Sequence, residues 1–99
     1  MKVTIQTLHF KADRKLEDFI NVKLDKLGIV YENVIGGEVT LRLENVDDNN
    51  NKIADIRLII PGYDLFASKQ SKSFEEATDQ AVEALRKQLT KRKAKIRAK

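Results

Sequence analysis

The sequence of 99 residues has no cysteine, one histidine, one proline and four glycines. Without cysteine the chain forms neither disulfides nor thiolate metal sites, which fits the reducing cytoplasm. Its apolar runs span only a few residues, well short of the roughly 18 that a membrane-spanning helix needs. The first residues alternate like a strand and lack the apolar block of a signal peptide. We therefore expect a cytoplasmic protein that does not enter a membrane.

Groups that carry catalysis or bind metals are also scarce. His9 has no cysteine or Ser-His-Asp pattern to join, so we expect it at a strand end or on the surface. The polar loop 47–51 fails as a calcium loop, because Lys52 replaces the required glycine and Leu58 the bidentate glutamate. The pair at 36–37 precedes a strand, so these glycines predict a bend or bulge and not a phosphate cradle. We expect no enzyme, metal, cofactor or small-molecule substrate.

What the chain does contain predicts one domain over residues 1–99. Apolar residues make up 41% and charged residues 34%, a normal balance for a soluble globular protein. Hydrophobic periodicity predicts the order β-α-β-β-β-α. The expected elements are a strand at 2–8, a helix from about 14 to 27, strands at 38–44, 54–60 and 63–69, and a helix at 74–97.

This order predicts an α+β fold. A helical crossover joins the first two strands, so they are parallel if they are neighbours, and the later strands form an antiparallel meander. Each alternating strand has one apolar face and both helices are amphipathic. The economical arrangement is a four-stranded sheet with two helices packed on one face.

Both helices carry signals at their ends. Asp13 is a plausible N-cap of the first, and Gly28 is expected to end it. The second opens on a capping box from Ser73 to Glu76. Its length from 74 to 97 is about 36 Å at 1.5 Å per residue, more than the sheet of so small a domain covers. Residues 90–99 therefore form a basic helical rod or fray until a partner orders them.

Positive charge is concentrated at the end of the chain. Residues 86–99 contain eight Lys or Arg and no acidic residue, which leaves a tail of +8 beside a body of −4. One or two cations would complement the helix dipole, but eight exceed that need, because like charges such as Lys87 and Lys91 repel one another. Clustered cations attract phosphates and release their counterions, so the tail favours nucleic-acid binding.

Two further observations refine this prediction. Lys23 and Lys26 are neighbours on the first helix and extend the basic stripe if the two helices lie side by side. The outward positions of the two central strands hold Thr40 and Arg42, then Asp55 and Arg57, which leaves no aromatic platform for stacking bases. Recognition of the shape and phosphates of structured RNA is favoured over sequence-specific reading of single strands.

Three stretches together resemble the family of short ribosome hibernation promoting factors and ribosome-associated inhibitors (protein Y). They are Lys15–Leu27, the turn Pro61–Gly62 with the strand that follows, and Phe74–Lys93. The last is the most specific, because its Ala- and Asp-containing opening leads into Leu, basic residues, Gln-Leu and further basic residues. Each stretch alone is an ordinary amphipathic helix or turn, and their order and spacing carry the resemblance over essentially the whole chain.

The resemblance implies a domain like the double-stranded-RNA-binding domain, with an added first strand. It implies binding to the small ribosomal subunit between head and body, where the protein overlaps messenger RNA, tRNA and initiation factors. Ribosomes are thereby held idle during starvation or stationary phase, as a stress response. In the family, basic residues on the two helices contact the ribosomal RNA. The matching positions here are Lys23, Lys26, Arg86, Lys87, Lys91, Arg92, Lys93 and Lys95.

The chain departs from the family pattern in two places. Ser73, Phe74 and the acidic pair 75–76 stand where the family often has an Asp and an aromatic residue. The segment 7–10 lacks the glycine that many members carry after the first strand. Long members add a C-terminal dimerising domain. This chain stops at Lys99, so we expect that it does not pair ribosomes by that route. We also expect it to be a monomer when free.

Two other functions fit the same residues. A general binder of structured RNA, such as double-stranded RNA or tRNA, would use the same cations, and it differs by binding an arbitrary duplex as well as it binds ribosomes. A protein-interaction module would dock its basic helix on an acidic partner, and its complexes would resist ribonuclease.

Overall fold

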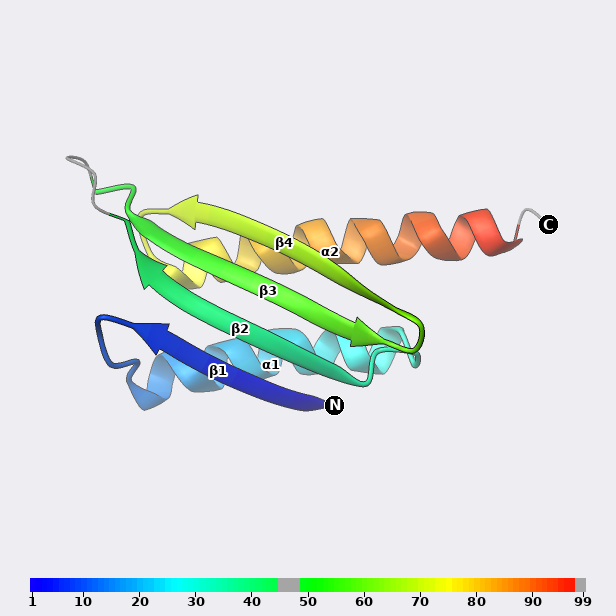
Figure 1. Cartoon of the computed structure of the whole chain (residues 1–99), viewed down its shortest axis with the longest axis horizontal. Coiled ribbons are helices and arrows are strands. Elements are labelled where there is room, and N and C mark those ends of the chain that lie inside the picture. The colour runs from blue at the N-terminus through cyan, green and yellow to red at the C-terminus, as the bar shows by residue number, and fades with distance from the viewer. Residues whose placement is uncertain (45–48, 98–99) are drawn as a thin grey trace.

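The computed structural model describes residues 1–44 and 49–97, with side chains of the last helix described as far as Lys91. The predicted order β-α-β-β-β-α is confirmed (Figure 1). The elements are β1 Lys2–Leu8, α1 Arg14–Val30, β2 Gly36–Leu43, β3 Lys52–Ile60, β4 Tyr63–Ser71 and α2 Phe74–Arg97.

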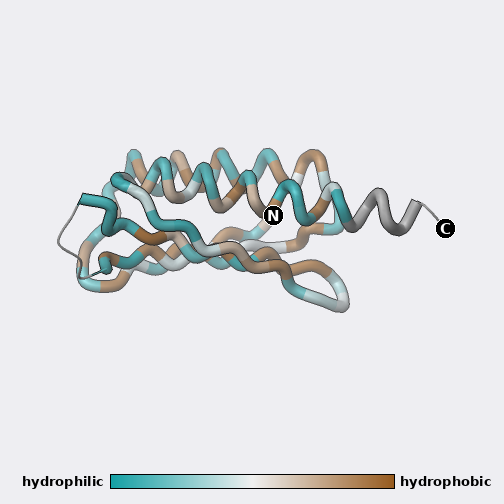
Figure 2. The backbone as a smooth tube through the Cα atoms, turned by 90° about the horizontal axis from the view of Figure 1, so that it is seen from above, coloured by the Kyte–Doolittle hydropathy of each residue, from teal (hydrophilic) through white to brown (hydrophobic). Residues whose placement is uncertain are grey.

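The four strands form one sheet in the order β1-β2-β3-β4. The expected parallel pairing of β1 with β2 is confirmed, with Ile5 opposite Val39. The other two pairings are antiparallel. Both helices lie on one face of this sheet and run side by side in the same direction (Figures 1 and 2). We call α1 and α2 together the helix layer, and the uncovered side of the sheet the open face.

One core lies between the helix layer and the sheet. Most of the predicted apolar positions of both helices and of the central strands are buried in it. Phe19 and Phe74 are half-buried, and Leu43, predicted to face inward, is 41% exposed at the end of β2. The largest fully buried side chains are Ile20, Leu24, Leu41, Ile56, Leu58 and Leu85. Leu89 is the last buried residue of α2 that the structure describes. The helix continues to Arg97 and extends past the β3–β4 turn (Figure 1). The basic half of α2 thus continues from the packed half as one helix.

The predicted cap of α1 is present, and the predicted capping box of α2 is half formed: among the described residues only the bond to Ser73 Oγ is made. The Leu16 amide donates to Asp13 Oδ1 at 2.8 Å, and the Glu76 amide donates to Ser73 Oγ at 3.1 Å. The carboxylate of Glu76 accepts a hydrogen bond from Gln80 Nε2 at 3.4 Å. The caps satisfy backbone amides that the first turns leave without helical partners.

The prediction that Gly28 ends the first helix was wrong. α1 continues to Val30, and the amide of Tyr31 still donates to the Leu27 carbonyl at 2.8 Å. A Cβ atom at position 28 would lie 3.3 Å from the side chain of Met1. The glycine therefore serves close packing against the start of β1, and the helix tolerates it.

The predicted bend or bulge at 36–37 was also wrong. Both glycines lie in the regular part of β2, where Gly37 pairs with Val3 and Leu58. A Cβ atom on Gly37 would lie 3.3 Å from Leu24 of α1. The missing side chain thus lets α1 approach the sheet.

A buried hydroxyl in α2 yields the first prediction. Thr78 is fully buried, and its Oγ1 has no hydrogen-bond partner among the described residues. Because a buried polar group without a partner costs about 1–3 kcal/mol, Thr78→Val should raise the free energy of unfolding by about 1 kcal/mol. Urea denaturation measures the change. The control is Thr90→Val, whose exposed hydroxyl bonds Tyr31 Oη at 2.5 Å and should confer no gain. A less stable Thr78→Val protein would contradict the prediction.

Candidate nucleic-acid interface

The packing of the two helices brings Lys23 of α1 next to α2. Lys23 Nζ lies 2.8 Å from Asp79 Oδ1 and 5.5 Å from the centre of the Phe19 ring. Lys26 is exposed one turn further along α1. The hydrogen bond between Tyr31 Oη, directly after α1, and Thr90 Oγ1 of α2 is a second link between the two helices. The condition set by the sequence, that the helices lie side by side, is therefore met.

The predicted cations of α2 whose side chains are described are all exposed. They are Arg86, Lys87 and Lys91. Arg86 Nε donates to Glu83 Oε2 at 3.1 Å, and its Nη2 donates to the other oxygen of the same carboxylate. These bonds lower the pKa of the Glu83 carboxyl, with a further contribution from Lys87, and they raise the pKa of Arg86.

The remaining predicted cations are Arg92, Lys93 and Lys95. Their backbone belongs to α2, but their side chains lie outside the described residues, so their role stays a prediction. The segment from Thr90 to Arg97 adds about 12 Å of helix at 1.5 Å per residue. The fold thus presents the start of the basic run on a helix and not on an irregular tail.

Lys69 is a cation that the sequence reasoning missed. It lies on β4 and lines a shallow hollow on the helix layer together with Asp79, Glu83 and Lys87. Strand alternation could have found it, because Leu65 and Ala67 pack against the core and the next position on that side is 69. We define the basic face as these described cations: Lys23, Lys26, Lys69, Arg86, Lys87 and Lys91.

The cations of the basic face fall into two groups. Lys23 and Arg86 form the internal ion pairs described above. Lys26, Lys69, Lys87 and Lys91 form no ion pair with a described residue. Lysine offers a compact charge with three donors, and arginine a planar fork that matches a phosphate. Both kinds suit the backbone of a nucleic acid, which has no need of a deep pocket.

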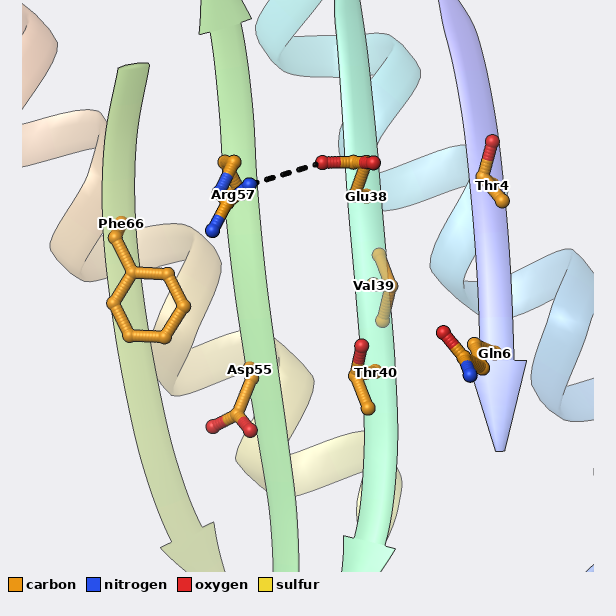
Figure 3. Close-up of a pocket in the computed structure, with 8 residues that line it drawn as sticks. All are labelled: Thr4, Gln6, Glu38, Val39, Thr40, Asp55, Arg57 and Phe66. Carbon is orange, nitrogen blue, oxygen red and sulfur yellow. Dashed lines mark ion pairs between the residues drawn. The ribbon is translucent and has the colours of Figure 1, made fainter. Parts of the chain in front are cut away.

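The open face differs from the basic face in charge. Arg57 lies 3.6 Å from Glu38, and Arg42 Nε donates to Asp55 at 3.0 Å, which raises the pKa of Arg42. A hollow of about 250 Å³ lies among the side chains drawn in Figure 3. The sequence placed Thr40, Arg42, Asp55 and Arg57 on this face correctly. Since Arg42 and Arg57 are paired with carboxylates of the same face, the open face is a poorer site for phosphates than the basic face.

One aromatic side chain on the open face went unpredicted. Phe66 of β4 is 53% exposed and lines the same hollow (Figure 3). It lies on an edge strand, whereas a base-stacking sheet places its aromatics on the central strands. Arg57 of β3 and Glu38 of β2 occupy the central-strand positions in register with Phe66. Because the central strands carry no exposed aromatic residue at these positions, recognition of the shape and phosphates of RNA is still favoured over stacking on its bases.

The described residues include no group of three or more acidic, histidine or cysteine side chains placed to hold a metal ion. His9 is exposed directly after β1, with φ of 70°, in the region that favours glycine. Asp47 and Asp48 of the rejected calcium loop lie outside the described residues. In the described part of the chain, no helix is long and apolar enough to cross a bilayer.

Comparison with known proteins gives matches along nearly the whole chain. Residues 3–97 match the family described as Sigma 54 modulation protein / S30EA ribosomal protein. The curated ribosome hibernation promoting factor of Klebsiella oxytoca is 27% identical over 97 residues, which cover 98% of each chain.

Two solved structures share the fold. A ribosomal subunit interface protein from Coxiella burnetii has a TM-score of 0.82 at 19% identity, covering 95% of this chain and 99% of its own. The N-terminal domain of Protein Y from Thermus thermophilus has a TM-score of 0.79 at 20% identity, and the match covers 92% of this chain and 98% of that domain's chain. These likenesses support the α+β fold with both helices on one face of the sheet.

Proposed function

Because the chain belongs to the Sigma 54 modulation protein / S30EA ribosomal protein family, we propose that it is a ribosome hibernation factor. It binds the small ribosomal subunit in the channel for messenger RNA and tRNA and inhibits translation by occluding that channel. The observation that carries this proposal is the similarity to a curated ribosome hibernation promoting factor over 98% of both chains.

The shape and charge of the fold support this mode of action. The chain measures 48 × 24 × 19 Å, so it is long enough to lie along a channel and thin enough to enter one. Five cations of the basic face lie on the helix layer and the sixth, Lys69, on β4, and α2 extends past the sheet (Figure 1). We assign RNA contact to the six cations of the basic face and, from the sequence, to Arg92, Lys93 and Lys95. Phosphate contacts of this kind fix position and need no base reading.

Inhibition by occlusion requires no chemistry from the protein. The matched family is one of ribosome-associated proteins and not of enzymes. A factor that only fills the channel needs no cofactor, no metal and no small-molecule substrate. Its partners are the small subunit and its ribosomal RNA. It would act in the cytoplasm, where ribosomes translate, and we propose that it is a monomer when free.

Sedimentation with purified ribosomes tests the proposal. At low salt the protein should pellet with ribosomes and with isolated small subunits, and excess messenger RNA and tRNA should compete with it. A sucrose gradient with and without the protein would show the change in the ribosome profile. Failure to pellet at low salt, or binding to the large subunit alone, would contradict the proposal.

The second candidate function is general binding of structured RNA, and the composition of the basic face favours it. The basic face offers amines and guanidinium groups that recognise phosphates of any sequence. Equal affinity for an arbitrary RNA duplex and for ribosomes would support this candidate over hibernation. Complexes that survive ribonuclease would instead indicate an acidic protein partner.

A further inference from the structure

Two carboxylates lie among the cations of the basic face. Asp79 and Glu83 are one turn apart on α2 and line the same hollow as Lys69 and Lys87. Asp79 holds Lys23 across the helix layer at 2.8 Å, and Glu83 holds Arg86 within α2 through two hydrogen bonds. Each acid thus binds a cation that the proposed function assigns to RNA.

These pairs occupy the groups that a phosphate would bind. The Arg86 guanidinium donates two hydrogen bonds to the two carboxylate oxygens of Glu83. The same two donors could bind two oxygens of a phosphate. The Lys23 amine is held between the Asp79 carboxylate and the Phe19 ring. An RNA that approaches the basic face must open these pairs or leave the two cations unused.

The pairs are exposed enough to open. The side chains of Asp79 and Lys23 are 61% and 31% exposed, and those of Glu83 and Arg86 are about half exposed. Ion pairs at such sites contribute little to stability, since water and salt screen them. Their position in the basic face is therefore better explained by RNA binding than by folding.

We propose that Asp79 and Glu83 determine RNA specificity by keeping Lys23 and Arg86 in internal ion pairs. An arbitrary duplex touches the unpaired cations Lys26, Lys69, Lys87 and Lys91 and leaves the pairs closed. A surface shaped to engage the whole basic face at once opens both pairs and gains two further phosphate contacts. The inference rests on the proposed function, because that surface is ribosomal RNA.

The test uses Asp79→Asn and Glu83→Gln, which keep side-chain shape and remove one charge each. For an arbitrary RNA duplex at about 0.1 M salt, each should tighten binding by up to about eightfold. The slope of log affinity against log salt should steepen by about one, because one more cation meets a phosphate. For ribosomes the slope should stay unchanged, because these cations already contact phosphates there, and affinity should rise less than for the duplex.

Two controls separate this effect from a general change in charge. Asp64→Asn makes the same change on the open side of β4 and should leave the duplex slope unaltered. In a Lys23→Gln background, Asp79→Asn should lose its effect, because the cation that it frees is gone. Circular dichroism melting checks the fold of each variant, and Glu83→Gln tests the idea independently of Asp79.

Several results would overturn the inference. They are unchanged or weaker duplex binding by both variants, an equal steepening of the slope for ribosomes, and an effect of Asp79→Asn that persists without Lys23. Failure of the wild-type protein to bind ribosomes would overturn the proposed function instead. Because the duplex and ribosome series are measured separately, the two failures are distinguishable.

Discussion

Raising the salt concentration from 50 to 200 mM should weaken the binding of this protein to ribosomes by roughly a thousandfold. Each phosphate contact releases condensed counterions, and about six contacts give a slope near −5 in log affinity against log salt. The effect requires about six of the nine cations assigned to RNA to contact phosphates, and each further contact would steepen the slope by about 0.9. Sedimentation or fluorescence anisotropy across four or five salt concentrations measures the slope.

The fold itself should not change over this range of salt, because its core is apolar and its surface ion pairs contribute little. Circular dichroism at each salt concentration is the control. A slope shallower than about −2 would mean that phosphates are not the main ligand, and would favour an acidic or apolar protein partner. A steep slope shared by an arbitrary duplex at equal affinity would favour general RNA binding.

The core and the order of elements were predictable because both depend on local pattern. The alternation of apolar and polar residues predicted the strands β2 and β3. The helical spacing of apolar residues such as Ile20 and Leu24 predicted the buried side of α1. The caps at Asp13 and Ser73 use side chains within three residues of their partners. Such short-range hydrogen bonds follow from sequence alone.

The errors at the two glycine sites arose where distant segments meet, whereas Lys69 was an omission that strand alternation could have avoided. Gly28 was taken as the end of α1, yet the helix continues past it, and a side chain at this position would meet Met1, which lies far away in the sequence. Gly37 was taken as a bulge, yet it makes room for Leu24 of α1. The ion pair of Lys23 with Asp79 joins two helices and depends on how they pack. No local pattern contains these distances, so the division of the basic face into paired and unpaired cations required the structure.

Replacing Lys91, Arg92 and Lys93 with Gln should weaken ribosome binding by a few hundredfold at about 0.1 M salt. If all three contact phosphates, their loss removes nearly three units from the salt slope, since each contact contributes about 0.9. Stability should change little, because Leu89 is the last described residue of α2 in the core.

The matched control for this α2 variant is the triple change Lys2→Gln, Lys11→Gln and Arg57→Gln. These exposed cations lie outside the basic face and carry the same total charge, so affinity should fall only a few-fold through long-range attraction. Equal losses in the two triple variants would show that net charge governs binding. A larger loss in the α2 variant, with the shallower slope, would locate the RNA contact on the projecting half of that helix.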